Sequence, residues 1–205
     1  MNIGAAGRLV LDATGRLYSN GMNTTLSGNV SHRIGSGNMV ITPSGLDKAR
    51  IGTSKLSLVG IGSERLVRGP KQSSEYHVHT RLYRALPEVT AVVHPHAPYS
   101  MGVISALGAR RVVEEISGSD EEYGYYVTSV ASVGRMKAGT VEIGDAVASA
   151  AKKGAKVIIM EDHGTVGIGD TMQKALDRVE YFEYMVKKLH IRHIEELYAR
   201  LPGRR

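Results

Sequence analysis

Two histidines stand two residues apart in the stretch 91-AVVHPHAPYS-100. On an extended backbone, residues i and i+2 project to the same face, so His94 and His96 can reach one metal ion. A third candidate ligand, His163, lies in the glycine-containing turn 161-EDHG-164, after another β-rich run. Three neutral imidazoles with an open fourth position are typical of a catalytic zinc site. Taken alone, this spacing equally fits ordinary histidines at strand ends.

The other histidines favour structural roles. Glu75 and His79 would share one face of a helix at i,i+4, so they are an alternative pair of metal ligands. His77 lies between them in the sequence. The remaining three are expected on a strand or on a solvated helix end: His32, His190 and His193.

The elements that must position these residues follow from the spacing of the apolar residues. Positions that recur every three or four residues predict helices at about 5–19, 74–86, 99–107, 141–154 and from 171 onward. Short β-rich runs bounded by Gly, Pro or Ser predict strands at 29–34, 38–42, 56–61, 89–94, 125–131, 156–160 and 165–169. The acidic stretch 117–124 is expected to be a loop. Because the order lacks strict βαβ alternation, the sequence predicts an α/β or α+β fold with a central, mostly antiparallel sheet flanked by helices.

Length and composition set the class of protein. A chain of 205 residues can bury one substantial core, so we expect a single domain over residues 1–205. No apolar stretch approaches the roughly 20 residues that span a bilayer, which excludes a membrane role. The chain has no Cys, and its N-terminal stretch lacks the apolar segment of a secretion signal, so a cytoplasmic location is expected. Without thiolates, a zinc ion must be held by histidines and carboxylates.

The charge favours an anionic partner, because the formal net charge is +6 and the pI is about 9.5. The basic residues are scattered, apart from pairs and the terminal 203-GRR-205. This distribution favours a phosphorylated small molecule and argues against nucleic acid, for which no motif is present. The absence of Cys and the small number of Asn and Gln favour a heat-loving source.

Several stretches together resemble the class II aldolase and adducin-head family, whose enzymes include fuculose-1-phosphate aldolase and ribulose-5-phosphate 4-epimerase. The blocks that carry the resemblance are 26-LSGNVSHR-33, 41-ITPSG-45, 73-SSEYHVHTRLYRALPEVTAVVHPHAPYS-100 and 161-EDHG-164. They follow the family's order and spacing over residues 5 to 190. The resemblance therefore implies that family's fold.

The resemblance also implies roles for individual residues. His94, His96 and His163 match the family's zinc ligands, and Glu75 matches the acid/base residue, which can also contact the metal in the empty site. The positions that match the substrate phosphate site are Gly28, Asn29, Ser44, Gly45, Ser73 and Ser74. Backbone N–H groups in glycine-containing turns, small hydroxyls and the positive end of a helix suit a dianion.

The implied activity is zinc-dependent cleavage of a ketose 1-phosphate, similar to fuculose 1-phosphate, to dihydroxyacetone phosphate and an aldehyde. A metal-stabilised enediolate would carry the developing charge. Glu75 stands where the resembling epimerases have Asp, which favours aldol cleavage over 4-epimerisation of a pentulose phosphate. A dehydratase and a decarboxylase on the same scaffold stay open. A non-catalytic adducin-like interaction domain is a more distant alternative, because all four site residues are present.

The sequence departs from the family pattern at two places. The tyrosine that donates a proton in fuculose aldolases has only candidate counterparts, Tyr123, Tyr125 and Tyr126, which packing would also explain. Arg135 and Lys137 replace the apolar wall of those enzymes, so a polar or anionic aldehyde half is expected. The resemblance also implies a homotetramer with active sites between neighbouring subunits.

Overall fold

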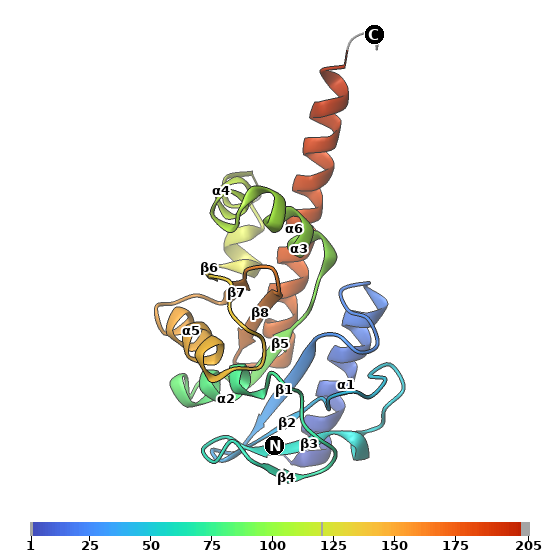
Figure 1. The fold of residues 1–205 in the computed structure, drawn as a ribbon, viewed down its shortest axis with the longest axis vertical. Coiled ribbons are helices and arrows are strands. Elements are labelled where there is room, and N and C mark those ends of the chain that lie inside the picture. Colours follow the sequence, from blue (N-terminus) through green and yellow to red (C-terminus); the bar gives the residue numbers. More distant parts are fainter. Residues whose placement is uncertain (1, 120, 202–205) are drawn as a thin grey trace.

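The computed structural model describes residues 2–119 and 121–201, so the terminal basic residues lie outside it. Its strands are β1 (Asn29–Ile34), β2 (Asn38–Ile41), β3 (Ser57–Gly60), β4 (Leu66–Arg68), β5 (Ala91–His94), β6 (Val130–Val133), β7 (Val157–Met160) and β8 (Gly164–Gly169). They form one 8-stranded sheet in the order β4-β3-β2-β1-β5-β8-β7-β6 (Figure 1). Among these eight described strands, only β6 and β7 pair in parallel. The predicted central, mostly antiparallel sheet is confirmed.

Helices cover both faces of this sheet. They are α1 (Ile3–Ser19), α2 (Tyr76–Ala85), α3 (Pro98–Leu107), α4 (Ala109–Ser119), α5 (Val141–Lys152) and α6 (Met172–Ala199). One core cluster joins the sheet to α2 and α5, and a second joins the opposite face to α1 and the start of α6. The C-terminal end of α6 extends beyond the rest of the molecule (Figure 1). In the described ranges, no helix has the length and apolar character needed to cross a bilayer.

The middle of the sheet is apolar because it is covered on both sides. In β5, Val92 belongs to the cluster under α2 and α5, whereas Val93 belongs to the cluster under α1 and α6. A strand with two buried faces is expected to be a continuous apolar run. Full burial of such a side chain stabilises the fold by about 1.5–3 kcal/mol. The strand that ends in His94 is therefore firmly anchored.

The region after α3 differs from the sequence prediction. The strand expected at 125–131 is a π-helical turn, Tyr123–Val127, and β6 begins only at Val130. Tyr125 faces outward, with 82% of its surface exposed, and Tyr126 stacks on Tyr181 of α6. Their β-forming tendency has no strand partner here, and tertiary context overrides it.

Two elements were not predicted. Helix α4 extends into the expected 117–124 loop, and it is supported by an Arg110–Glu114 ion pair of 2.8 Å at i,i+4. Gly108, with φ of 84°, ends α3 immediately before it. Strand β4 is a three-residue edge strand with all residues exposed, so no apolar alternation marks it in the sequence.

Candidate metal centre

The central strands bring the candidate ligands to one end of the sheet. β1 runs antiparallel to β5, and Asn29 at its start is the register partner of His94. β8 lies on the other side of β5 and begins immediately after the turn that contains His163. The starts of β1 and β8 therefore meet the end of β5. Glu75 stands at the N-terminal end of α2.

The Nε2 atoms of His94, His96 and His163 converge on the carboxylate of Glu75. Glu75 Oε1 lies 2.8 Å from His163 Nε2, and Oε2 lies 3.1 Å from His94 Nε2 and 3.7 Å from His96 Nε2. The two Nε2 atoms of His94 and His96 are 3.0 Å apart. One ligand atom from each of the four residues lies within 4.8 Å of the others. The structure thus brings together the four residues that the sequence singled out.

This donor set fits a divalent metal ion. Two nitrogens bound tetrahedrally to one zinc at about 2.0–2.1 Å would be about 3.3–3.4 Å apart, near the 3.0 Å found for His94 and His96. His94 Nδ1 donates a hydrogen bond of 2.7 Å to the carbonyl of Thr165, which leaves the Nε2 lone pair for a metal. Glu75 Oε1 is buried without a hydrogen bond of good geometry. A cation between these groups would satisfy it.

Gly164 lets the ligand-bearing segments approach each other. Its φ is 155°, and an added Cβ would lie 2.5 Å from the carbonyl oxygen of Pro95 and 3.0 Å from His94 Cε1. No larger residue fits there without moving the backbone between His94 and His96. Gly164 therefore fixes the distance between His163 and the other two histidines.

The charges in the cluster stabilise one another. Burial raises the pKa of Glu75, but His94 and the other histidines lower it by more than burial raises it, so its pKa is well below its usual value. Burial lowers the pKa of His94, but the Glu75 carboxylate and the hydrogen bond to the Thr165 carbonyl together raise it more, so the net change is upward. For His96, burial dominates and lowers the pKa. The histidines therefore favour the ionised form of Glu75.

A buried hydrogen-bond chain runs from Glu75 back into the protein, and the sequence did not reveal it. Asn29 Nδ2 donates to Glu75 Oε2 at 2.8 Å, and Asn29 Oδ1 accepts from His79 Nε2. His79 Nδ1 then accepts from the Ser31 hydroxyl at 2.6 Å, and Ser31 Oγ lies 2.8 Å from Tyr83 Oη. Burial lowers the pKa of His79 to about 3, so the ring is neutral and one tautomer satisfies both neighbours.

The candidate phosphate residues lie on three segments that pack side by side. Gly28 and Asn29 begin β1, Ser44 and Gly45 follow β2, and Ser73 and Ser74 precede α2. Backbone hydrogen bonds join the last two segments, from Ser44 N to Lys71 O at 2.9 Å and from Ser73 N to Thr42 O at 3.2 Å. A third bond, from Thr42 N to Val30 O at 3.1 Å, connects them to β1.

Asn23 is a second residue that the sequence did not mark. Its Oδ1 accepts a hydrogen bond of 2.9 Å from the backbone N–H of His96. Gly28 has φ of 64°, and a Cβ there would lie 2.4 Å from the Asn23 amide. Asn23 therefore ties the candidate phosphate segment to the candidate metal ligand, and Gly28 makes room for it.

The family model described as Class II Aldolase and Adducin N-terminal domain matches residues 8–190. The chain belongs to this family. It is 35% identical over 173 residues to the 5-methylthioribulose-1-phosphate/5-deoxyribulose-1-phosphate aldolase of Rhodospirillum rubrum, covering 82% of this chain and 72% of that protein. It is 26% identical over 192 residues to a methylthioribulose-1-phosphate dehydratase of Stenotrophomonas maltophilia, covering 89% of each. The four-residue cluster is thus a candidate metal site in an enzyme of the class II aldolase superfamily.

The fold agrees with this membership. A crystal structure described as a sugar-phosphate aldolase from Thermotoga maritima superposes with a TM-score of 0.82 over 97% of both chains, at 19% identity. At this identity the likeness concerns the fold. It shows the class II aldolase architecture of one sheet covered by helices.

The tyrosine candidates of this class II aldolase-family protein lie outside the cluster of Glu75 and the three histidines. Tyr123 packs against the core around α3, α4 and α6, and Tyr125 projects from the surface. Within the described residues, no hydrogen bond or ion pair links any of Tyr123, Tyr125 and Tyr126 to the ligand group.

Arg135, expected at the aldehyde half, forms an ion pair with Asp162, the neighbour of His163. Lys137 is exposed on the same loop.

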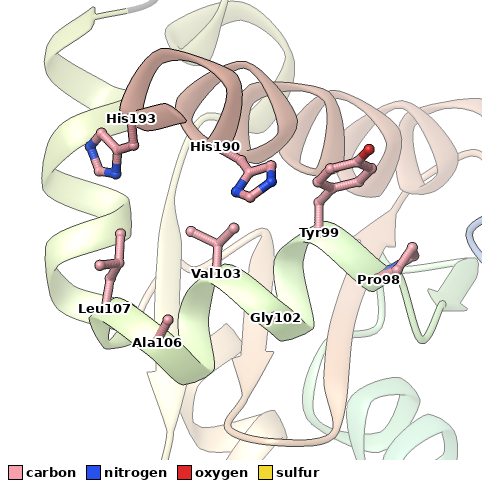
Figure 2. Close-up of a pocket in the computed structure, with 8 residues that line it drawn as sticks. All are labelled: Pro98, Tyr99, Gly102, Val103, Ala106, Leu107, His190 and His193. Carbon is pink, nitrogen blue, oxygen red and sulfur yellow. The ribbon is translucent and has the colours of Figure 1, made fainter. Parts of the chain in front are cut away.

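The other histidines lie outside the cluster. His77 Nδ1 is 3.4 Å from Glu64, which also pairs with arginines of α2. His32 is buried in β1, as expected. His190 and His193 line a pocket of about 480 Å³ between α3 and α6, together with Tyr99 and Leu107 (Figure 2). His193 Nε2 also lies 2.8 Å from Glu115 Oε2. The prediction that His190 and His193 lie on a solvated helix end is therefore only partly correct.

Proposed function

We propose that the protein is a zinc-dependent aldolase that cleaves a ketose 1-phosphate to dihydroxyacetone phosphate and an aldehyde. The observation that carries this proposal is the convergence of three imidazole nitrogens and one buried carboxylate at the end of β5. Three histidine ligands leave positions for substrate oxygens, which suits Lewis-acid catalysis better than a closed structural site. Membership of the family supports the same class of reaction.

The substrates named for the relatives narrow the choice of ketose substrate. An aldolase and a dehydratase similar to this chain are both named for methylthioribulose 1-phosphate. We therefore propose a ribulose 1-phosphate with a 5-deoxy or 5-methylthio end as substrate, which refines the fuculose 1-phosphate-like compound expected from the sequence. The ion pair between Arg135 and Asp162 supports this choice, because a paired arginine does not require an anionic aldehyde.

The residues of the chain account for the proton movements. As the C3–C4 bond breaks, one proton leaves the C4 hydroxyl and one must reach C3 of dihydroxyacetone phosphate. Glu75 is ionised in the site and acts as the acid/base that accepts and returns a proton. Asn29 holds Glu75 Oε2, so Oε1 is the oxygen left for proton exchange. Zinc held by His94, His96 and His163 would polarise the ketose carbonyl.

Product analysis tests this proposal against its alternatives. The zinc-loaded protein is incubated separately with 5-methylthioribulose 1-phosphate, fuculose 1-phosphate, ribulose 5-phosphate and a 3-oxo acid phosphate, with zinc-loaded Glu75→Gln protein as the matched control. Formation of dihydroxyacetone phosphate and an aldehyde is expected. Loss of water would identify a dehydratase, an epimeric pentulose phosphate a 4-epimerase, and carbon dioxide from a 3-oxo acid phosphate a decarboxylase. The absence of any product, with zinc bound, would favour the adducin-like interaction domain.

We also propose a homotetramer with active sites at subunit interfaces. Tyr125 is 82% exposed, so it is the candidate proton donor best placed to reach a neighbouring subunit. The end of α6 projects from the rest of the molecule (Figure 1). It carries exposed apolar residues, among them Ile191 at 49% and Leu197 at 64%. Such faces mark contacts with other chains. Light scattering at micromolar concentration is expected to show four chains, and a fully active monomer would contradict the proposal.

A further inference from the structure

The candidate phosphate residues carry no positive charge of their own. They are two glycines, an asparagine and three serines: Gly28, Asn29, Ser44, Gly45, Ser73 and Ser74. A phosphate monoester at neutral pH carries a charge of about −1.5 to −2. Charge-assisted hydrogen bonds from an ammonium or a guanidinium are about twice as strong as neutral ones. A cationic partner close to these segments would therefore contribute strongly to binding.

Lys48 is a buried cation on one of these segments. It follows Ser44 and Gly45 by only a few residues, and just 7% of its surface is exposed. A lysine is rarely so buried unless its ammonium is paired. Among the described residues, no carboxylate lies within 4.0 Å of Lys48 Nζ, so it takes part in no ion pair. The position of Lys48 thus calls for an anion that the protein itself does not supply.

The contacts of Lys48 join two of the candidate phosphate segments. Its backbone N–H donates to the carbonyl of Thr25 at 2.9 Å, and its Nζ donates to the carbonyl of Leu26 at 2.5 Å. Leu26 lies two residues before Gly28, and Thr25 lies three residues before it. An ammonium has three N–H donors, and the bond to Leu26 uses one of them. The other two are available to a ligand.

The charge of Glu75 acts on Lys48. Burial lowers the pKa of Lys48, and the carboxylate of Glu75 partly opposes that change by raising it. Glu75 is therefore close enough for its charge to be felt at Nζ, although the two groups form no ion pair.

We infer that Lys48, which lies on the segment that follows β2 and is bonded to Leu26 shortly before β1, is the cationic ligand of the substrate phosphate. This inference rests on the proposed function for the identity of the ligand as a sugar phosphate. Lys48 binds the phosphate and takes no part in the chemical step, so its loss affects binding more than turnover. A purely structural lysine, which only fastens the Leu26 loop, would leave phosphate affinity unchanged.

The test compares Lys48→Met with Lys55→Met. Both changes remove one positive charge, but Lys55 is exposed in the 3-10 turn Thr53–Lys55 and belongs to none of the three segments. Calorimetric titration of zinc-loaded protein with inorganic phosphate is expected to show about tenfold or greater loss of affinity for Lys48→Met. Its KM for the phosphorylated ketose should rise by a similar factor, with a smaller change in kcat. Lys55→Met should stay within about twofold of the unmodified protein on both measures.

Equal phosphate affinity and KM in Lys48→Met and the unmodified protein, with zinc retained, would overturn the inference. If Lys48→Met does not fold, the unmodified protein still gives an answer through the ¹⁵N resonance of the Lys48 ammonium, assigned by its absence from a Lys48→Arg spectrum. Inorganic phosphate should shift this resonance, and an unchanged resonance at saturation would also overturn the inference. These phosphate measurements do not depend on the reaction catalysed. A failure to form dihydroxyacetone phosphate would refute the aldolase proposal and leave the Lys48 result standing.

Discussion

Two regions on either side of Glu75 use buried histidines for different purposes. At the end of β5, His94 is fully buried and binds a backbone carbonyl through Nδ1, while its Nε2 faces Glu75 and His96. On α2, His79 is equally buried, but both of its nitrogens are occupied, by Asn29 and by Ser31. His94 therefore keeps its Nε2 lone pair for a metal ion, whereas His79 has no nitrogen lone pair left for one.

This difference separates a metal ligand from a structural histidine better than burial or spacing does. The i,i+4 pair of Glu75 and His79 was a possible rival metal pair in the sequence. In the structure, Glu75 belongs to the ligand group, whereas His79 is part of a hydrogen-bond chain that orients Asn29. A histidine in such a chain supports the site indirectly, because it fixes which oxygen of Glu75 is free.

The largest effect is expected from the ligand histidines. His163→Ala removes one of three imidazole donors, so bound zinc should fall steeply and activity with it. Excess zinc should partly restore both, because the remaining ligands still hold the ion. Metal content after dialysis and kcat are the measurements, and His190→Ala, which changes a histidine outside the cluster, is the control. If protein with His94, His96 and His163 all replaced by Ala retained one zinc per chain, the ligand assignment would be wrong.

A change at Glu75 should separate metal content from turnover. Glu75→Gln keeps the size of the side chain and leaves the three imidazoles in place, so zinc should largely remain. Turnover should fall about 10²-fold or more, since an acid/base residue contributes on that order. Parallel assays of zinc and kcat check this split. Near-normal turnover with every substrate tried would show that another group exchanges the proton.

The sequence predicted the fold well where apolar spacing was strong. The continuous apolar run before His94 and the long apolar face of α6 both correspond to observed elements. It failed between α3 and β6, where Tyr125 and Tyr126 resemble strand residues but lie in a π-helical turn against α6. That turn depends on a partner far away in the chain, Tyr181, which local propensity cannot reveal.

For the site, the sequence indicated side chains with distinctive chemistry but missed their supports. The spacing of His94 and His96 marked a possible metal site because it follows directly from strand geometry. Asn23 and Lys48 carried no such mark, since their importance comes from a backbone N–H and a backbone carbonyl on other segments. Hydrogen bonds to the backbone leave little trace in residue type, so such supports emerge only from the structure.

An intermediate effect is expected at His79. His79→Phe preserves a ring of similar size but leaves Asn29 Oδ1 and Ser31 Oγ without their buried partner. The free energy of unfolding should fall by about 1–3 kcal/mol for each group left unsatisfied. Turnover should fall less than in Glu75→Gln, because Asn29 loses its orientation while Glu75 stays in place. Denaturant titration and zinc assays check this, and zinc loss as steep as in His163→Ala would place His79 among the ligands.

The smallest effect is expected at Glu115, a partner of a histidine that is neither a ligand nor buried. His193 on α6 lies 2.8 Å from Glu115 of α4, which also pairs with Arg111 and Arg192. The hydrogen bond from Arg111, followed by those from His193 and Arg192, lowers the pKa of Glu115 to about 2.

Because the folded pKa of Glu115 is below the ordinary value of 4.5, the unfolded chain takes up the proton first as the pH falls. Its contribution to stability is therefore complete above about pH 4.5 and lost as the pH falls towards 2. Glu115→Gln should reduce the free energy of unfolding by less than about 1 kcal/mol at pH 7, since the ion pairs are near the surface. The difference from the unmodified protein should vanish near pH 2, as measured by urea titration at both pH values. Zinc content and kcat should be unchanged, and a loss of either would mean that α4 and α6 support the metal centre more directly than their contacts indicate.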